Sequence, residues 1–130
     1  MDDTLPVNDG TALARDLGVL LRDHKGGDVA VLDMRALNGW TNFFVIATVS
    51  SHTHLQGLLR HIKEFCRDQG ADILRGRRKI ALEDEWALID LGTVVVHLMT
   101  EKSRSFYELE RLWNTGGAHI QYLESGTKEG

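Results

Sequence analysis

The amino-acid sequence predicts a single α/β domain in which helices flank one mixed β-sheet. The 130 residues are enough for one domain with its own hydrophobic core. Apolar residues recur at helical spacing in some segments and alternate, as in strands, in others. These segments follow one another as helix, two strands, helix, two or three strands and helix. Interleaving of this kind is typical of helices packed on a sheet.

A first helix is expected after a polar, flexible arm over residues 1–10. Thr11 can cap this helix, and the pair Gly26-Gly27 can end it. Its leucines recur at i, i+4, i+7 and i+8 and share one face: Leu13, Leu17, Leu20 and Leu21. We expect that face to pack on the sheet.

Two strands and a second helix follow. Residues 28–34 and 42–49 are rich in the branched and aromatic side chains that favour strands. Either Ser50 or Ser51 can cap the next helix. Its apolar stripe is expected in the core: Leu55, Leu58, Leu59, Ile62, Phe65 and Cys66.

Residues 86–99 predict a β-hairpin, around which the rest of the chain is organised. Two apolar runs flank Gly92-Thr93, and a Gly-X pair in this position is typical of a two-residue type II′ turn. This turn places Trp86 opposite Met99 and Asp90 opposite Val95. One face of the hairpin is wholly apolar and is expected in the core: Ala87, Ile89, Leu91, Val94, Val96 and Leu98. The other face is mixed: Trp86, Leu88, Asp90, Val95, His97 and Met99.

The mixed face of the hairpin has two interpretations. Left uncovered, it is a large apolar patch of the kind that marks a binding surface. Covered by a helix of the same chain, it makes Asp90 and His97 core polar groups that bond to each other or to the backbone. We expect the face to be open to solvent or to a partner, because the opposite face supplies the apolar surface that the core needs.

The remaining segments are less regular. Ile80–Leu82 can form a short strand. Thr100 can cap a last helix, whose apolar residues share one side: Phe106, Leu109 and Trp113. The chain then turns glycine-rich and polar, which predicts a flexible tail over residues 115–130 and a folded domain over residues 11–114.

One basic run has two interpretations as well. It contains Arg75, Arg77, Arg78 and Lys79. The run is either a solvated loop or a set of phosphate contacts to RNA, which would position the protein without reading base sequence. The net charge of −4 argues against non-specific binding of nucleic acid by the whole surface.

Composition and motifs argue against several chemistries. The six histidines and the single cysteine lack the spacings of a metal site, and no glycine-rich phosphate loop occurs, so we expect neither metal nor cofactor. The alternative to a binding protein is a nucleotidyltransferase-like enzyme, since strand carboxylates such as Asp33 and Asp90 could hold two metal ions. The acidic N-terminus lacks a signal-peptide core and no apolar run could span a bilayer, so a cytoplasmic protein is expected.

Several motifs resemble the ribosomal silencing factor (Iojap) family. They are Val31-Leu32-Asp33, Thr41-Asn42-Phe43-Phe44-Val45-Ile46-Ala47-Thr48, Ser50-Ser51, the block Trp86…Asp90-Leu91-Gly92…Val95-Val96-His97, and Arg104-Ser105-Phe106-Tyr107-Glu108-Leu109-Glu110-Arg111-Leu112-Trp113. The resemblance runs from about Leu13 to Trp113. Asn42-Phe43 stand where the family usually has Asp-Tyr, and the basic run stands where the family usually has Glu-Gly.

The resemblance implies a fold similar to the nucleotidyltransferase fold but without its catalytic residues. It implies a translational repressor that binds ribosomal protein fourteen of the large ribosomal subunit, blocks joining of the small subunit and often forms homodimers. No catalytic residue is then expected. The expected partner-binding residues are those that match the family motif, together with two neighbours on the mixed face: Trp86, Asp90, Gly92, His97, Leu88 and Met99.

Overall fold

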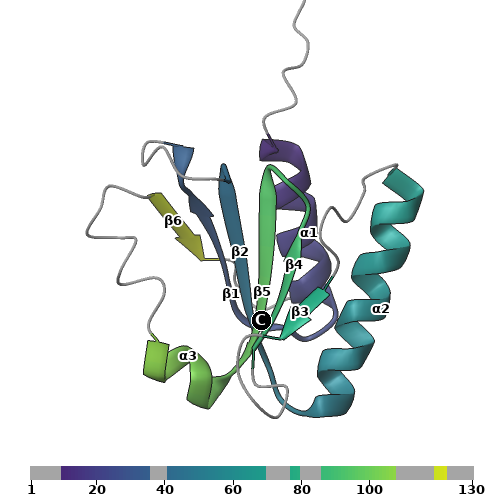
Figure 1. Ribbon diagram of the computed structural model, residues 1–130, viewed down its shortest axis with the longest axis vertical. Coiled ribbons are helices and arrows are strands. Elements are labelled where there is room, and N and C mark those ends of the chain that lie inside the picture. The colour runs from purple at the N-terminus through teal and green to yellow at the C-terminus, as the bar shows by residue number, and fades with distance from the viewer. Residues whose placement is uncertain (1–9, 36–40, 70–76, 80–85, 108–118, 123–130) are drawn as a thin grey trace, which may run out of the picture.

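The computed structural model describes residues 10–35, 41–69, 77–79, 86–107 and 119–122. The helices are α1 (Thr11–Asp23), α2 (His52–Gln69) and α3 (Glu101–Tyr107). The strands are β1 (Gly27–Asp33), β2 (Phe43–Val49), β3 (Arg77–Lys79), β4 (Trp86–Asp90), β5 (Val94–Thr100) and β6 (His119–Tyr122) (Figure 1). The predicted α/β class, with one mixed sheet flanked by helices, is confirmed.

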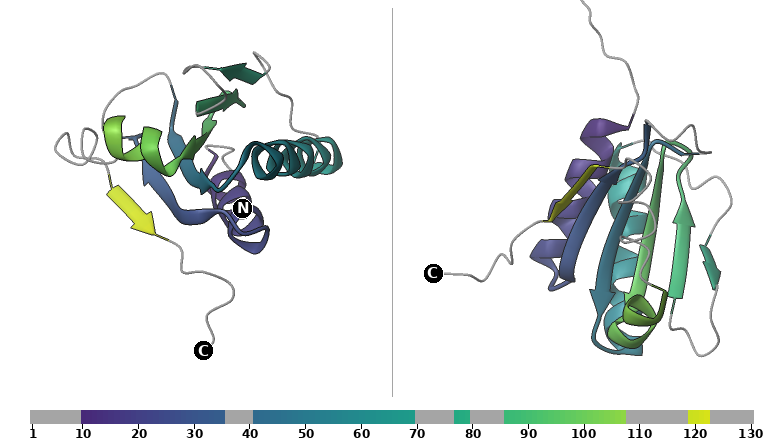
Figure 2. Two further views of the ribbon diagram at one scale, coloured as in Figure 1. Left: turned by 90° about the horizontal axis from the view of Figure 1, so that it is seen from below. Right: turned by 90° about the vertical axis from the view of Figure 1, so that its left-hand side faces the viewer.

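The strands form one six-stranded sheet in the order β3-β4-β5-β2-β1-β6. The central pair, β2 and β5, is parallel, and the other neighbours are antiparallel. Helices α1 and α2 cover one face, and α3 lies on the other face near the end of β5 (Figure 2). The sheet therefore has protein on both sides, which is the usual situation of strands in a parallel pair.

Two apolar clusters lie on the two faces of the sheet. The first lies under α1 and α2 and includes the wholly apolar face of the hairpin, as predicted. The second lies on the opposite face and consists of Ala30, Leu32, Met34, Phe44, Ile46, Trp86, Val95 and Met99, with Leu88 packed against it. We call this second group the far-face cluster. The alternation of side chains along β2, β4 and β5 matches the pattern that the sequence predicts.

Helix α1 begins and ends differently from the prediction. Gly10, not Thr11, is the N-cap residue. At the other end Lys25 adopts a positive φ of 72°, Lys25 N–H donates to Arg22 O (3.1 Å) and Gly26 N–H donates to Leu21 O (2.7 Å). This is the Schellman pattern, with lysine in the left-handed position that glycine usually occupies. Gly26 is needed for a different reason, because a Cβ there would lie 2.8 Å from Leu21 O.

Helix α2 is capped by Ser51, one of the two predicted caps, whose Oγ accepts from His54 N–H (3.0 Å). The His54 ring connects α2 to the end of α1. Its Nδ1 accepts from Ser50 N–H (3.0 Å), so Nε2 carries the proton and donates to His24 O (3.1 Å). The His24 and His61 rings stack beside it with centroids 3.7 Å apart. These histidines hold two helices together.

Helix α3 is capped by Thr100 as predicted, since Thr100 Oγ1 accepts from Ser103 N–H (3.1 Å). Arg104 ties the helix to the sheet by donating to Gly27 O (3.2 Å) and to Thr48 Oγ1 (2.9 Å). Phe106, the first residue of the predicted apolar stripe, is 78% exposed. The other members of its predicted stripe, Leu109 and Trp113, lie outside the described residues. None of the helices in the described ranges has the length and hydrophobicity to cross a membrane.

Two edge strands depart from the predicted pattern. Arg77–Lys79, within the basic run, forms β3 and pairs with β4, whereas the predicted strand at Ile80–Leu82 lies outside the described residues. His119–Tyr122 forms β6 and pairs with β1, although the sequence predicts a flexible tail there. Arg77–Lys79 has no alternation and His119–Tyr122 alternates over only four residues, so local sequence is a weak signal for either strand.

Candidate functional site

The β4–β5 hairpin has the predicted register. Trp86 pairs with Met99, Leu88 with His97 and Asp90 with Val95. At the turn Leu91 N–H donates to Val94 O (2.9 Å), and Gly92 has a φ of 93°. Thr93 is not among the residues with positive φ, which excludes a type I′ turn and agrees with the φ signs of the predicted type II′ turn.

The turn also organises the adjacent chain. Asp90 Oδ1 accepts from Gly92 N–H (2.9 Å), which holds the carboxylate over the turn. Thr93 O accepts from both Asn42 N–H and Phe43 N–H at 3.0 Å, where β2 begins. The motif residues Asp90 and Gly92 therefore have a structural role in fixing this end of the sheet.

Trp86 and His97 form a hydrogen-bonded pair on the mixed face. Trp86 Nε1–H donates to His97 Nδ1 over 3.0 Å. An indole nitrogen can only donate, so His97 Nδ1 carries no proton and the neutral ring holds its proton on Nε2. In the predicted register the two residues are diagonal neighbours on one face, within reach of long side chains. Their proximity therefore follows from the register, although the sequence alone does not assign the bond.

His97 is almost completely enclosed, with 3% of its surface exposed. Phe44, which sequence analysis did not single out, meets the imidazole in an edge-on contact with centroids 4.4 Å apart. Burial lowers the pKa of His97 from 6.5 to about 3, because the charged ring would lose its hydration. Nε2 is buried without a hydrogen-bond partner in the part of the chain that the structure describes.

The expectation that the mixed face is open to solvent is wrong. Trp86 is 8% exposed, Asp90 5%, and Met99 is fully buried. Side chains of β1 and β2 pack with this face in the far-face cluster, and Phe44 lies against His97, which accounts for its burial. Leu88 and Gly92 are half-buried and are the most accessible of the six predicted partner-binding residues.

The alternative interpretation, that Asp90 and His97 bond to each other or to the backbone, is correct in part. Asp90 bonds to the backbone of Gly92. His97 bonds to neither, because its Nδ1 is occupied by Trp86. The two polar groups on this face therefore have different partners, and only His97 keeps an unpaired buried atom among the described residues.

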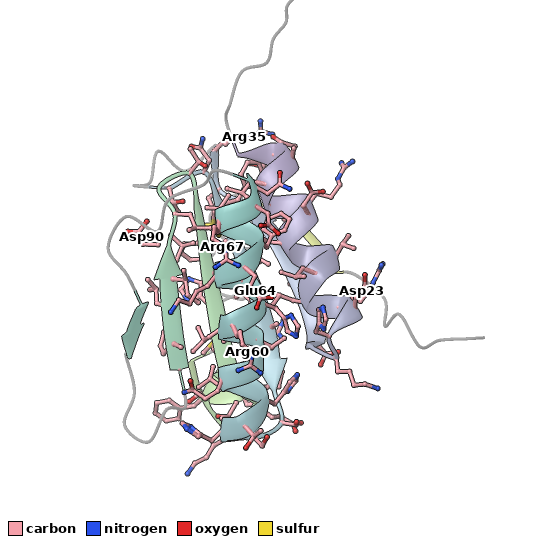
Figure 3. The ribbon with its side chains drawn as sticks, turned by 90° about the vertical axis from the view of Figure 1, so that its right-hand side faces the viewer. Asp23, Arg35, Arg60, Glu64, Arg67 and Asp90 are labelled. Carbon is pink, nitrogen blue, oxygen red and sulfur yellow. The ribbon has the colours of Figure 1, made fainter. Side chains whose placement is uncertain are left out.

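The two carboxylates proposed for an enzyme do not meet. Asp33 is on β1 and Asp90 on β4, with β2 and β5 between them, a lateral distance of about 14 Å at the usual strand spacing. Metal ions in two-metal sites are only about 4 Å apart. Asp33 instead pairs with Arg35 (2.6 Å), and Figure 3 shows Arg35 well apart from Asp90.

Other candidate groups have structural roles. Burial raises the pKa of the Cys66 thiol, which lies in the first cluster, so the thiol is a poor nucleophile. Within the described ranges no three metal-binding side chains converge. Of the basic run, the structure describes Arg77 to Lys79 as β3, in register with Ile89, Leu88 and Ala87.

Acid is expected to destabilise the protein through His97. Between about pH 6.5 and pH 3 an unfolded chain binds a proton at this position that the folded ring does not, so stability falls as the pH drops through this range. Between pH 7 and pH 5 this residue alone should remove about 2 kcal/mol from the free energy of unfolding. Urea unfolding at the two pH values measures the loss.

The matched control for this experiment is His97→Asn, which lacks the titrating ring. Its unfolding free energy should fall by about 2 kcal/mol less than that of the wild type over the same pH interval. Equal losses in the two proteins would show that His97 does not stay neutral in the folded state.

The fold and the site define a small mixed α/β domain whose central hairpin carries a buried Trp–His pair. A crystal structure of a Chromobacterium violaceum protein has a similar fold, with a TM-score of 0.70, 30% identity, and coverage of 90% of this chain and 95% of that one.

Sequence comparison assigns the family. The family described as "Ribosomal silencing factor during starvation" matches residues 7–129. The ribosomal silencing factor of Treponema pallidum is 37% identical over 93 residues, which are 72% of this chain and 82% of that protein. A mouse protein named "Mitochondrial assembly of ribosomal large subunit protein 1" is 30% identical over 99 residues, covering 72% of this chain and 42% of the mouse protein. The chain belongs to the ribosomal silencing factor family, whose members are ribosome-associated regulators of translation.

Proposed function

We propose that the protein binds the large ribosomal subunit, through ribosomal protein fourteen, and represses translation by blocking the joining of the small subunit. The observation that carries this proposal is the family match over residues 7–129. The name of the mouse relative, which refers to the large ribosomal subunit, supports the choice of subunit. The protein would act in the cytoplasm, where ribosomes assemble, and without catalysis.

The contact surface that we propose is centred on the hairpin. Leu88 and Gly92 are the accessible members of the set and would touch the partner. Trp86, Asp90, His97 and Met99 lie behind them and would hold the surface in shape. The buried residues would therefore act by supporting the accessible ones and not by direct contact with the partner.

Co-sedimentation with separated ribosomal subunits tests the proposal. The wild type should pellet with large subunits and not with small ones. Leu88→Glu places a charge in the proposed interface and should weaken pelleting at least tenfold, a loss of about 1.4 kcal/mol. Gln56→Glu on α2 is the matched control, since it is also half-buried and gains the same charge on the other side of the sheet. If Leu88→Glu and Gln56→Glu pellet equally well with large subunits, the hairpin is not part of the interface.

The mode of repression is expected to be steric. If occupancy blocks joining, then large subunits incubated with the protein and cleared of it should regain the ability to bind small subunits. Sedimentation of the rejoined particles measures the recovery. Subunits that stay inactive after the protein has been removed would point to chemical damage and against occlusion.

The basic run gives a further testable contact, which we propose to be with ribosomal RNA. Arg75, Arg77, Arg78 and Lys79 could each neutralise a phosphate. Affinity falls as the salt concentration rises, and each contact adds about 0.7–0.9 to the magnitude of the slope of log affinity against log salt concentration. Replacing Arg77 and Arg78 by alanine should therefore lower the slope of subunit binding by about 1.5. If the slope does not change, Arg77 and Arg78 do not contact RNA, and the run is a solvated segment.

The homodimer implied by the family resemblance is proposed here as well. Sedimentation velocity of the free protein over a range of concentrations tests it, and a monomer at all concentrations would exclude it.

A further inference from the structure

Helix α2 carries a row of cations on its exposed surface. The row consists of Arg60, Lys63 and Arg67, which are spaced at i, i+3 and i+7 and span about 10 Å along the helix axis. All three side chains are exposed. Among the described residues no carboxylate lies within ion-pair distance of any of them, whereas Arg22 and Arg35 each pair with an aspartate. The described part of the chain therefore leaves this cation row available to an anion from a partner.

The two carboxylates of α2, Glu64 and Asp68, lie on a different side of the helix from the cation row. His61 marks the side that faces α1, because its ring stacks on that of His24 with centroids 3.7 Å apart. At about 100° per residue, Glu64 and Asp68 lie within about 60° of His61 around the helix axis. The three cations lie about 100–160° from His61, all in the same direction. The acidic side of α2 therefore turns toward α1, and the basic side turns away from it.

The basic side of α2 faces the edge of the sheet that β3 forms. Figure 3 looks onto α2, with α1 on one side of it and β4 and then β3 on the other. Strand β3 consists of three further cationic residues. Arg77 and Lys79 are in register with Ile89 and Ala87 of β4, which lie in the first cluster beneath the helices. Two basic segments that are separate in the sequence therefore lie on one side of the molecule.

This side is basic although the chain as a whole is acidic. Together α2 and β3 hold six cations and two carboxylates, a net charge of +4, in a chain whose net charge is −4. We propose that the cation row of α2 and the strand β3 form one surface that contacts the phosphate backbone of RNA in the large ribosomal subunit. This inference rests on the proposed function and extends the contact of the basic run to a second element of the fold.

The arrangement favours an RNA backbone over an acidic protein as the partner. A nucleic-acid duplex presents roughly six phosphates along a length of about 10 Å, so each cation of the row can meet one. A protein–protein interface usually has an apolar core. The basic side of α2 lacks one, because the large apolar side chains of the helix belong to the first cluster or pack against it. Phosphate contacts of this kind position a protein without reading base sequence.

The double variant Arg60→Gln/Arg67→Gln tests the inference, with Arg15→Gln/Lys102→Gln as the matched control. Both remove two exposed cations, but the control positions are on α1 and α3. Co-sedimentation with large subunits is measured from about 0.05 to about 0.2 M salt. The α2 variant should lower the magnitude of the slope of log affinity against log salt concentration by about 1.5, so the wild type loses about eightfold more affinity over this range. The control should keep the wild-type slope.

A second measurement uses RNA without ribosomal protein. The fluorescence anisotropy of a labelled RNA duplex of about 16 base pairs reports binding by the protein alone. The wild type should bind the duplex at low salt, and the α2 variant should again show a slope lower by about 1.5. If subunit binding depends on Arg60 and Arg67 but the duplex is not bound, the partner is an acidic protein and the inference is wrong.

Gln56 offers a variant in which the contact should become stronger. This half-buried residue lies about one turn before Arg60 in line with the row. Gln56→Lys should raise the magnitude of the slope by about 0.7–0.9, and an unchanged slope would speak against the row. For the same reason, Gln56→Glu is compared with Leu88→Glu at high salt, where phosphate contacts contribute little to affinity.

The remaining outcomes separate this inference from the proposed function. An unchanged slope in the α2 variant, or an equal decrease in the control, would show that the row makes no local contact and would overturn the inference. A wild type that binds the duplex through the row but fails to pellet with large subunits would contradict the proposed function and leave the RNA-binding surface in place. A wild type that binds neither would contradict both. Circular dichroism spectra of all variants should match that of the wild type and exclude unfolding as the cause.

Discussion

Replacing Trp86 with alanine is expected to lower the free energy of unfolding by about 3–5 kcal/mol. The side chain is buried, packs in the far-face cluster and donates to His97. Its removal leaves a cavity and an unpaired ring nitrogen, each of which costs free energy. A loss of this size is a large part of the 5–15 kcal/mol that keeps a typical domain folded. Urea unfolding followed by circular dichroism measures it.

Trp86→Phe is the matched control for this substitution. It keeps most of the apolar surface but removes the N–H donor, so the expected loss is smaller, about 1–2 kcal/mol. A Trp86→Ala variant as stable as the wild type would show that the indole is not part of the core. Because the alanine variant is expected to be poorly folded, its binding to subunits does not isolate a contact, and the more accessible Leu88 is a better position for that purpose.

Replacing Gly10 with alanine is expected to cost about 2–4 kcal/mol, from two separate effects. Gly10 has a φ of 94° at the start of α1, a conformation that side chains disfavour. An added Cβ would also lie 2.8 Å from Thr93 Oγ1 and 2.9 Å from Thr93 Cβ at the hairpin turn. Thermal unfolding should show a clear decrease in Tm.

Gly57→Ala provides a control with the opposite sign. Gly57 lies inside α2, and the nearest atom to its added Cβ is the flexible end of Arg60, 3.9 Å away. Alanine in a helix interior is favoured over glycine by about 0.5–1 kcal/mol, so this variant should be more stable than the wild type. If Gly10→Ala also makes the protein more stable, the close approach of Gly10 to Thr93 does not have the expected destabilising effect.

The hairpin was the most predictable part of the fold because the residues that determine its structure are close together in the sequence. A two-residue Gly-X turn fixes which residues face each other, and alternation then assigns each side chain to a face. All five pairs from Trp86–Met99 to Asp90–Val95 have the predicted register. The caps at Ser51 and Thr100 are local in the same way.

The burial of the mixed face could not be predicted in this way. It depends on side chains of β1 and β2 that pack with this face, and no local pattern specifies which strands lie beside β5. The continuous apolar run Val94-Val95-Val96 was a signal for a strand enclosed on both faces. The unpaired Nε2 of His97 is likewise visible only when the surroundings of the ring are known.

The parallel pairing of β2 with β5 has a consequence for how the chain folds. Phe43 pairs with Val94 and Val49 with Thr100, so every contact in this central ladder joins residues 51 positions apart. Closing such a long loop is slow compared with forming the adjacent hairpins. During synthesis, the β1–β2 hairpin emerges first, and the apolar β2 keeps one open edge until β5 follows. An open edge of this kind can pair with another chain, so the nascent protein is most prone to aggregation before residue 94 has left the ribosome.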